Sequence, residues 1–355
     1  RNPHQETEGM IEVGFGDYDA WEVGGMLNGA LSDNVAGRIA FKYADRDGYG
    51  ENSYNGEDFG ARADLVARGK LLVDFTDQFS MLGTADYGEV SAEASGIEVL
   101  NSTNTPAFEA RTTELYGSSP ATKDSYDWKV HQAHDDQYED EQQGLSLDFN
   151  YEFRNGLALR SITATREWDS TYGNTDASYP AELIPGYFDY ATDTLSQEFQ
   201  LMSPGGETVD WLAGLYYYEE DYDIVTTRDI GEAFCDPNIS SLNPVFGLIC
   251  QASQQEDATV STFNQELESI AAFGQLTWNI NDSWNTTLGL RWSDDQKEGD
   301  YVMVLNNPAT ALFAANEEVL GMERDDSKTT WFGNVNWYVT DEIMLFATAS
   351  TGYKS

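Results

Sequence analysis

Hydrophobic and polar residues alternate along much of this chain, most clearly between residues 145 and 168. In the first half of this segment the apolar side chains fall at every second position, which places them on one face of an extended strand: Leu145, Leu147, Phe149, Tyr151 and Phe153. Asn155 and Gly156 then supply a tight turn, because both tolerate positive φ, and the chain returns as a second strand. The apolar face spans nine residues. A tilted strand needs roughly 9 to 11 residues to cross a bilayer, so the segment predicts a membrane-spanning hairpin.

The same unit recurs on both sides of this hairpin. Short turns near residues 32, 77, 155, 205, 282 and 340 join alternating segments, and we expect about thirteen strands in all. Long polar segments connect the hairpins, and we expect loops at about 46–60, 91–141, 169–193, 221–258 and 295–326. Short turns on one side and long loops on the other are typical of an outer-membrane barrel.

The returning strand from 157 to 168 departs from the alternation. Arg160 and Arg166 share a face with Ile162 and Ala164. This mixture predicts either a β-bulge or a different place for this strand in the sheet.

Composition supports membrane crossing by strands. Aromatic residues make up 13% of the chain and there are 31 glycines, yet the mean hydropathy is −0.51. Aromatic girdles at both interfaces, with a polar lumen and polar loops, give a barrel this composition. No apolar run approaches the roughly 18 residues of a membrane helix, so the sequence predicts an all-β, antiparallel transmembrane β-barrel.

Charge excludes one class of partner. The chain holds 62 acidic and 19 basic residues, a net charge of −43. Such a surface repels phosphate, so we expect no nucleic-acid partner. We interpret the charge as a hydrated, salt-adapted surface, and an acidic outer face that attracts cations is the alternative.

Cys235 and Cys250 are the only cysteines and lie in one expected loop. A disulfide between them would indicate an oxidising compartment and would stabilise the fold by about 3 kcal/mol in the chain-entropy picture. Two free thiols are the alternative, although the spacing fits no metal motif.

Few residues suggest a binding site. His131 and His134 could bind a transition metal with Asp135 or Asp136, but a solvated acidic loop explains them better, so we assign no metal site. Alternation points three cations toward the wet side, where they could meet carboxylates or an anionic ligand: Arg38, Lys42 and Arg291. Simple charge balance is the other explanation for them.

Five tryptophans fall on the apolar face of their strands and indicate a membrane girdle rather than a sugar-stacking surface: Trp211, Trp278, Trp292, Trp331 and Trp337. Catalytic motifs such as GxSxG are absent, so we expect no enzyme and no cofactor. A soluble all-β carbohydrate-binding module is the alternative class, but its repeats would have a fixed length and the turn spacings here are uneven.

Three phrases resemble one family: EGMIEVGFGDYDAWEVGGMLNGALSDNVAGRIAFKYADRDGY near the start, SQEFQLMSPGGETVDWLAGLYYYEE in the middle and FATASTGYKS at the end. They are similar to the barrel of TonB-dependent outer-membrane receptors of the iron-complex type. The resemblance implies a barrel of about twenty-two strands around a plug. Residues 1–9 would then be the plug-to-barrel linker and residues 10–355 the N-terminal part of the barrel, with the plug domain absent.

The resemblance also implies a function and partners. The protein would lie in the outer membrane of a Gram-negative bacterium, in contact with its lipid, and would couple to the TonB complex through the absent plug. Its loops would capture a scarce substrate, most readily a ferric siderophore. Vitamin B12, haem, oligosaccharides and nickel complexes remain alternatives.

Overall fold

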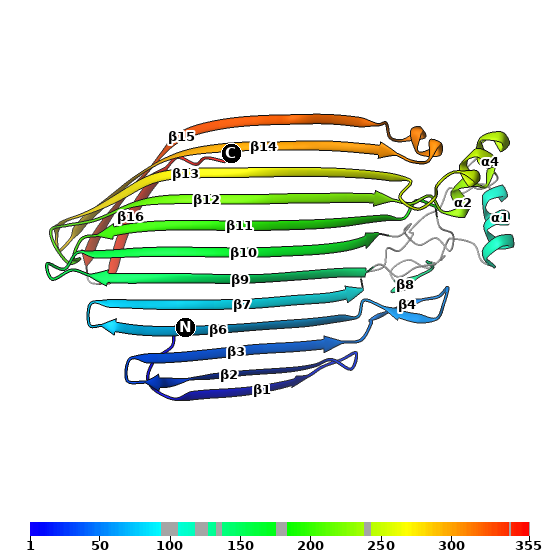
Figure 1. Cartoon of the computed structure of the whole chain (residues 1–355). Helices are drawn as coiled ribbons and strands as arrows, with labels where there is room; N and C mark the ends of the chain where they lie inside the picture. The colour runs from blue at the N-terminus through cyan, green and yellow to red at the C-terminus, as the bar shows by residue number, and fades with distance from the viewer. Residues whose placement is uncertain are drawn as a thin grey trace.

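A computed structural model describes residues 1–93, 106–117, 127–132, 137–174, 183–237, 243–340 and 342–354. Its main feature is one antiparallel sheet of 13 strands in sequence order, with β1 and β16 at its edges (Figure 1). The strands of this sheet are β1 (Glu8–Phe15), β2 (Trp21–Ser32), β3 (Val35–Arg46), β6 (Arg62–Thr76), β7 (Phe79–Glu93), β9 (Gln137–Glu152), β10 (Ala158–Asn174), β11 (Gly186–Met202), β12 (Val209–Arg228), β13 (Thr259–Asn281), β14 (Trp284–Leu305), β15 (Glu317–Thr340) and β16 (Ile343–Ser350).

Smaller elements lie in the connections between these strands. A three-stranded sheet contains β4 (Gly50–Asn52), β5 (Glu57–Phe59) and β8 (Lys129–Val130). The helices are α1 (Pro106–Tyr116), α2 (Glu232–Cys235), α4 (Pro244–Ala252) and the 3-10 helix η1 (Pro308–Leu312). None of the described helices is long and apolar enough to span a membrane.

The two ends of the sheet differ as the sequence predicts. The six short turns near residues 32, 77, 155, 205, 282 and 340 are confirmed, and they gather at the left end of the sheet in Figure 1. The longer connections, with the helices and the small sheet, lie at the right end. We call these the turn end and the loop end.

Several expected loop bounds are wrong because the strands run further. Residues 169–174 belong to β10 and 186–193 to β11, while β12 continues to Arg228, β14 to Leu305 and β15 begins at Glu317. Polar residues occupy both faces through most of these extensions, and apolar residues occupy both faces at the end of β14, so no hydrophobic alternation marks the extensions in the sequence. Cross-strand hydrogen bonds do not depend on that period, and the ladder continues.

The expected bulge in β10 is also wrong. This strand pairs with β9 and with β11 without a register shift. The alternation weakens there because Thr163 and Thr165 stand where other strands place apolar residues, while Ile162 and Ala164 turn to the opposite face. The weak alternation in β10 therefore comes from the residue types in the strand and not from a distortion of its backbone.

The cross-strand pairing separates the side chains into two faces. The outer face carries large apolar residues that the structure leaves exposed, including Leu215, Leu288, Leu290 and Trp331. The inner face carries the buried side chains of the main sheet: Asn28, Ala36, Ser170, Thr259, Ala271, Ser293 and Asp295. Crowding of the inner side chains is expected on the concave side of a curved sheet.

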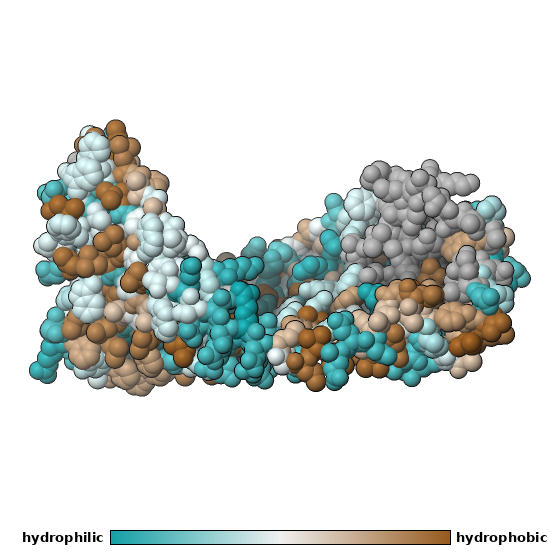
Figure 2. Space-filling view, turned by 90° about the horizontal axis from the view of Figure 1, so that it is seen from above, coloured by the Kyte–Doolittle hydropathy of each residue, from teal (hydrophilic) through white to brown (hydrophobic). Residues whose placement is uncertain are grey.

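The outer face changes character along the strands. All five of the predicted girdle tryptophans lie on it and are at least 36% exposed. Toward the loop end the face becomes acidic: Asp193 lies directly opposite Asp221, which lies opposite Glu266. On β11, β12 and β13 the apolar residues of the outer face therefore lie mostly nearer the turn end. Hydrophilic residues cover the middle of the molecule in Figure 2.

Helices from separate connections pack together at the loop end and form a cap. The predicted Cys235–Cys250 disulfide is present, and both cysteines are fully buried with Ile230, Ala258 and Ala309. Arg111 of α1 binds the buried Asp236 at 2.8 Å. The buried amide of Asn307 donates to the carbonyl oxygens of Cys250 and Gln254, so the cap joins three long connections.

Candidate binding surface on the inner face

Cations gather on the inner face of β3, β6 and β10. Arg38 and Lys42 of β3 face an open cavity of about 720 Å³ together with the other members of this basic cluster, Arg68, Lys70 and Arg166. Cross-strand pairing brings them together, because Arg38 lies opposite Lys70 and Lys42 lies opposite Val66. Strand alternation places Arg38 and Lys42 on one face of β3, four positions apart, and Arg68 and Lys70 on one face of β6, two positions apart.

Carboxylates neutralise the basic cluster only in part. Lys42 forms an ion pair with Glu22 at 2.7 Å. Asp86 forms ion pairs with Arg166 at 2.9 Å and with Arg68 at 3.8 Å. Arg38 lies 3.9 Å from Glu8. Three carboxylates thus contact four of the five cations of the cluster, in a chain of net charge −43.

An aromatic wall covers the inner face nearer the loop end. Rings of neighbouring strands contact each other in pairs, with centroid separations of 6.2 Å between Trp168 and Tyr190 and 6.1 Å between Tyr172 and Phe188. The Trp168 indole N–H donates to Asp140 at 2.7 Å. The wall is half-buried and comprises Tyr138, Trp168, Tyr172, Phe188, Tyr190, Tyr222, Phe263 and Tyr301.

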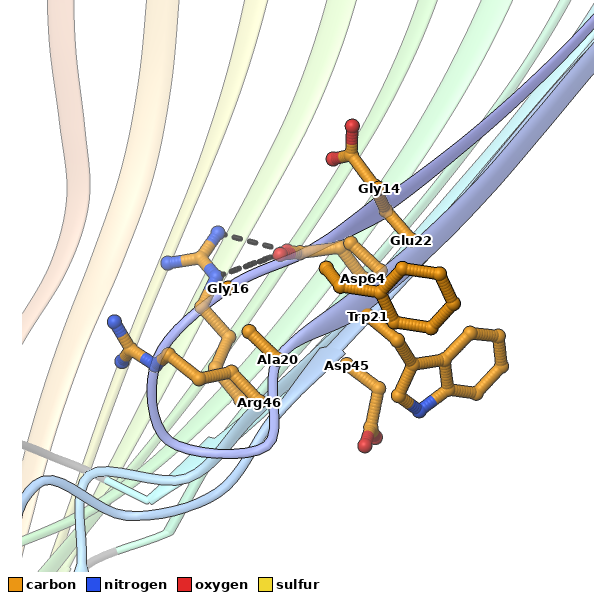
Figure 3. Close-up of a pocket in the computed structure, with 11 residues that line it drawn as sticks. Gly14, Gly16, Ala20, Trp21, Glu22, Asp45, Arg46 and Asp64 are labelled. Carbon is orange, nitrogen blue, oxygen red and sulfur yellow. Dashed lines mark hydrogen bonds and ion pairs between the residues drawn. The ribbon is translucent and has the colours of Figure 1, made fainter.

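Two smaller features adjoin this surface. A cavity of about 320 Å³ opens at the loop end of β1–β3, where Arg62 donates three hydrogen bonds to Asp64 and Arg46 extends beside them (Figure 3). Separately, the segment before β1 crosses the inner face: the fully buried Asn28 donates to the carbonyl oxygens of His4 and Glu6 at 3.1 and 2.8 Å. Lys70 binds Asn2 at 3.2 Å.

The residues proposed from the sequence have different surroundings. Arg38 and Lys42 belong to the basic cluster, whereas Arg291 on β14 lies apart from it, 5.3 Å above the Tyr216 ring and 5.7 Å from that of Phe273. Arg68, Lys70 and Arg166 are not among the binding residues predicted from the sequence. Alternation within residues 61–75 could have placed Arg68 and Lys70 on one face, but only the strand pairing brings Arg166 beside them.

His131 has no metal-binding geometry in the described residues. Its ring nitrogen Nδ1 hydrogen-bonds the Ser53 hydroxyl at 2.9 Å, and burial lowers its pKa. His134, Asp135 and Asp136 lie outside the described residues. Across the part of the chain that the structure describes, no three His, Cys, Asp or Glu side chains come together as metal ligands would.

Comparison with known families decides what this curved sheet is. The family described as "TonB dependent receptor-like, beta-barrel" matches residues 91–355. The chain belongs to this family of TonB-dependent receptor barrels. It is thus an antiparallel barrel wall of the Gram-negative outer membrane, in a family of transport receptors rather than enzymes.

Solved receptor structures share the fold at low sequence identity. The ferric yersiniabactin uptake receptor of Yersinia pestis superimposes with a TM-score of 0.74 and 17% identity over 98% of this chain and 46% of its own. The ferric-catecholate import receptor of E. coli K12 superimposes with a TM-score of 0.70 and 10% identity over 99% of this chain and 55% of its own. The ferripyoverdine receptor of Pseudomonas aeruginosa superimposes with a TM-score of 0.66 and 14% identity, over 98% of this chain and 42% of its own. This receptor chain therefore spans about half the length of those proteins.

Proposed function

We propose that the receptor takes up a ferric siderophore that carries negative charge and aromatic groups. The observation that carries the proposal is that a basic cluster and an aromatic wall share the inner face of one sheet. Cations attract an anionic chelate, and aromatic rings pack against its apolar parts. Vitamin B12 and neutral oligosaccharides would leave the basic cluster without a role.

The placement of the two zones supports a path. The aromatic wall lies nearer the loop end, and the basic cluster nearer the turn end. A chelate that enters from the loop end meets the rings first, where binding depends weakly on salt. It then reaches the cations, where the attraction is electrostatic.

Energy coupling would come from a plug and the TonB complex, as the family resemblance implies. Residues 1–9 would be the linker, which is supported by the hydrogen bonds that hold His4 and Glu6 against Asn28 on the inner face. A plug attached there would lie beside the basic cluster. The cap at the loop end would face outward and contribute to the entrance.

Isolation of the intact receptor from outer membranes tests this proposal. Mass spectrometry of the retained small molecule should identify an anionic iron chelate with aromatic groups, and uptake of that chelate should require TonB. A retained neutral ligand, or uptake that persists without TonB, would contradict the proposal.

A further inference from the structure

A groove crosses the outer face of the first strands, toward the turn end. Its cavity has a volume of about 590 Å³, and four glycines form its floor: Gly29, Gly37, Gly69 and Gly83. Strand pairing brings the glycines together, because Gly29 lies opposite Gly37, and Gly69 lies opposite Ala85. Glycine has no side chain to stand above the sheet, so these positions leave the surface hollow.

Large apolar side chains form the walls of this groove. They are 38–70% exposed and comprise Leu27, Leu31, Ile39, Leu71 and Leu145. A second cavity of about 550 Å³ shares Leu27 and Ile39 with the first and extends to Gly9 on β1. The two cavities therefore form one groove across the outer face, from β1 to β9.

The groove is uncharged. The outer-face positions of β3 from Val35 to Phe41 and of β6 from Ala67 to Phe75 hold only glycine and apolar residues. Arg38 and Lys70 also border the cavity, but they lie opposite each other on the inner face, where their side chains belong to the basic cluster. Hydrocarbon therefore suits this surface better than a charged or strongly polar ligand, because burial of a polar group without a hydrogen-bond partner is unfavourable.

Neither backbone conformation nor packing requires glycine at two of the floor positions. Gly69 and Gly83 do not have positive φ. Apart from its chain neighbours, a Cβ atom added at Gly69 would have no heavy atom within 4 Å, and one added at Gly83 would meet Leu147 at 3.7 Å, an ordinary contact. Glycine inside a strand costs stability, and it often marks a place where a ligand approaches the backbone. What these two glycines supply is open space.

The groove lies in the part of the outer face that contacts lipid. It is continuous with the apolar surface of β9, because Leu145 shares the outer face of that strand with Phe149, and an apolar band of this kind faces the bilayer in outer-membrane barrels. Gly37 lies two residues from the start of β3 and Gly83 four residues from the start of β7, so the groove is close to the turn end (Figure 1). Short turns face the periplasm in such barrels, so the groove opens to the periplasmic leaflet.

We propose that this groove binds an acyl chain of a phospholipid in the periplasmic leaflet and is a fixed lipid site on the receptor wall. Its volume is within the range of roughly 300–1,000 Å³ that small-molecule sites occupy. A flexible chain can follow the glycine floor and contact the apolar walls along its length, whereas an empty groove would lose these dispersion contacts. The site lies on the opposite face of the sheet from the basic cluster and does not depend on which substrate is transported.

Photolabelling of the full-length receptor tests the lipid site. The receptor is reconstituted into vesicles of phosphatidylethanolamine and phosphatidylglycerol, with a trace of phosphatidylethanolamine that carries a diazirine on one acyl chain. Mass spectrometry then measures the label at Leu71 and Leu145 in the groove, which are 38% and 52% exposed. Leu215 and Leu276 are the reference residues, because they lie on the same outer face and are 59% and 41% exposed. All four lie five to seven residues from the turn end of their strands, so their depths in the bilayer are similar.

Two variants fill the groove, and a third is the control. Gly69→Leu and Gly83→Leu each place a side chain on the floor, where the structure has room for it. Gly333→Leu places the same side chain on the outer face of β15, outside the groove. An added Cβ atom there meets Leu288 at 3.7 Å, so the control is matched in packing to Gly83→Leu.

In the parent, Leu71 and Leu145 should carry several times more label than the reference residues. Both groove-filling variants should lower that label to the reference level, with a melting temperature that stays equal or rises, and the control should label as the parent does. Even labelling of all four residues in the parent, or groove label that the filled variants retain, would overturn the proposal. A groove that stays unlabelled because it cross-links to a second copy of the receptor would overturn it as well.

Discussion

Arg38 on β3 lies directly opposite Lys70 on β6, so two cations face each other across a hydrogen-bonded strand pair. Like charges in this position destabilise a sheet. Glu8 at 3.9 Å from Arg38 and Asn2 at 3.2 Å from Lys70 compensate only in part. A pair that opposes folding is consistent with a role in binding an anion.

Replacement of Lys70 by Gln should therefore separate stability from binding. We expect the barrel to gain about 0.2–1 kcal/mol because the repulsion disappears, while the receptor loses affinity for an anionic ferric chelate. Thermal unfolding and binding, measured on one preparation, check both effects. Lys328→Gln, on the inner face of β15 outside the cluster, is the control, and equal loss of affinity in the two variants would contradict the account.

The acidic part of the outer face should respond to salt. Glu266 of β13 lies opposite Asp221 on one side and opposite Glu298 on the other. Glu266→Gln should raise stability by about 0.2–1 kcal/mol at low ionic strength. At about 1 M salt the gain should shrink, because the screening length falls to roughly 3 Å. A gain that does not change with salt would show that repulsion is not its cause.

The disulfide should stabilise the cap and leave the sheet unaffected. Cys235 and Cys250 are fully buried in the cap core, and closing their loop contributes about 3 kcal/mol in the chain-entropy picture. In the Cys235→Ser, Cys250→Ser double variant we expect protease cleavage within residues 229–258, with the strands still protected. Mass spectrometry of the fragments locates the cuts. Cleavage that begins in β12 or β13 would show that the disulfide also stabilises the sheet.

The sequence predicts the sheet better than the site, and particular residues show why. The alternation that includes Leu147 and Phe149 predicts their strand, because the membrane requires one face to be apolar. Turn residues such as Asn155 and Gly156 mark the end of that strand. Beyond the membrane this constraint disappears, so the start of β11 near Tyr187 shows no period. The basic cluster depends on pairing: Arg166 reaches Asp86 from 80 positions away, and no local pattern encodes that contact.

Asn28 should hold the segment before β1. Its side chain is 1% exposed and bonds to His4 and Glu6. Asn28→Ala removes the hydrogen bonds of this side chain to the backbone of His4 and Glu6, each of which contributes about 0.5–1.5 kcal/mol. Amide hydrogen exchange at residues 4–8 should accelerate, while Asn34→Ala, an exposed asparagine in a turn, should leave it unchanged. Equal protection in both variants would show that Asn28 does not anchor the segment.

Acid should loosen the small sheet at the loop end. Burial lowers the pKa of His131 below its usual 6.5, so the folded state resists protonation more than the unfolded state does. The stabilisation is complete above the unfolded pKa and is lost as the pH falls through the folded pKa. Hydrogen exchange at residues 50–53 should therefore increase below about pH 6. His131→Gln should abolish this pH dependence, and its persistence in that variant would assign it to another group.

Binding of a ferric catecholate to the full-length receptor tests the central claim most directly. The parent should bind it, and a Lys42→Gln, Arg68→Gln, Arg166→Gln variant should bind at least about tenfold more weakly. This difference should narrow as salt rises, because the lost attraction is electrostatic. Equal affinity in parent and variant, at every salt concentration, would contradict the claim that the inner-face basic cluster recognises an anionic chelate.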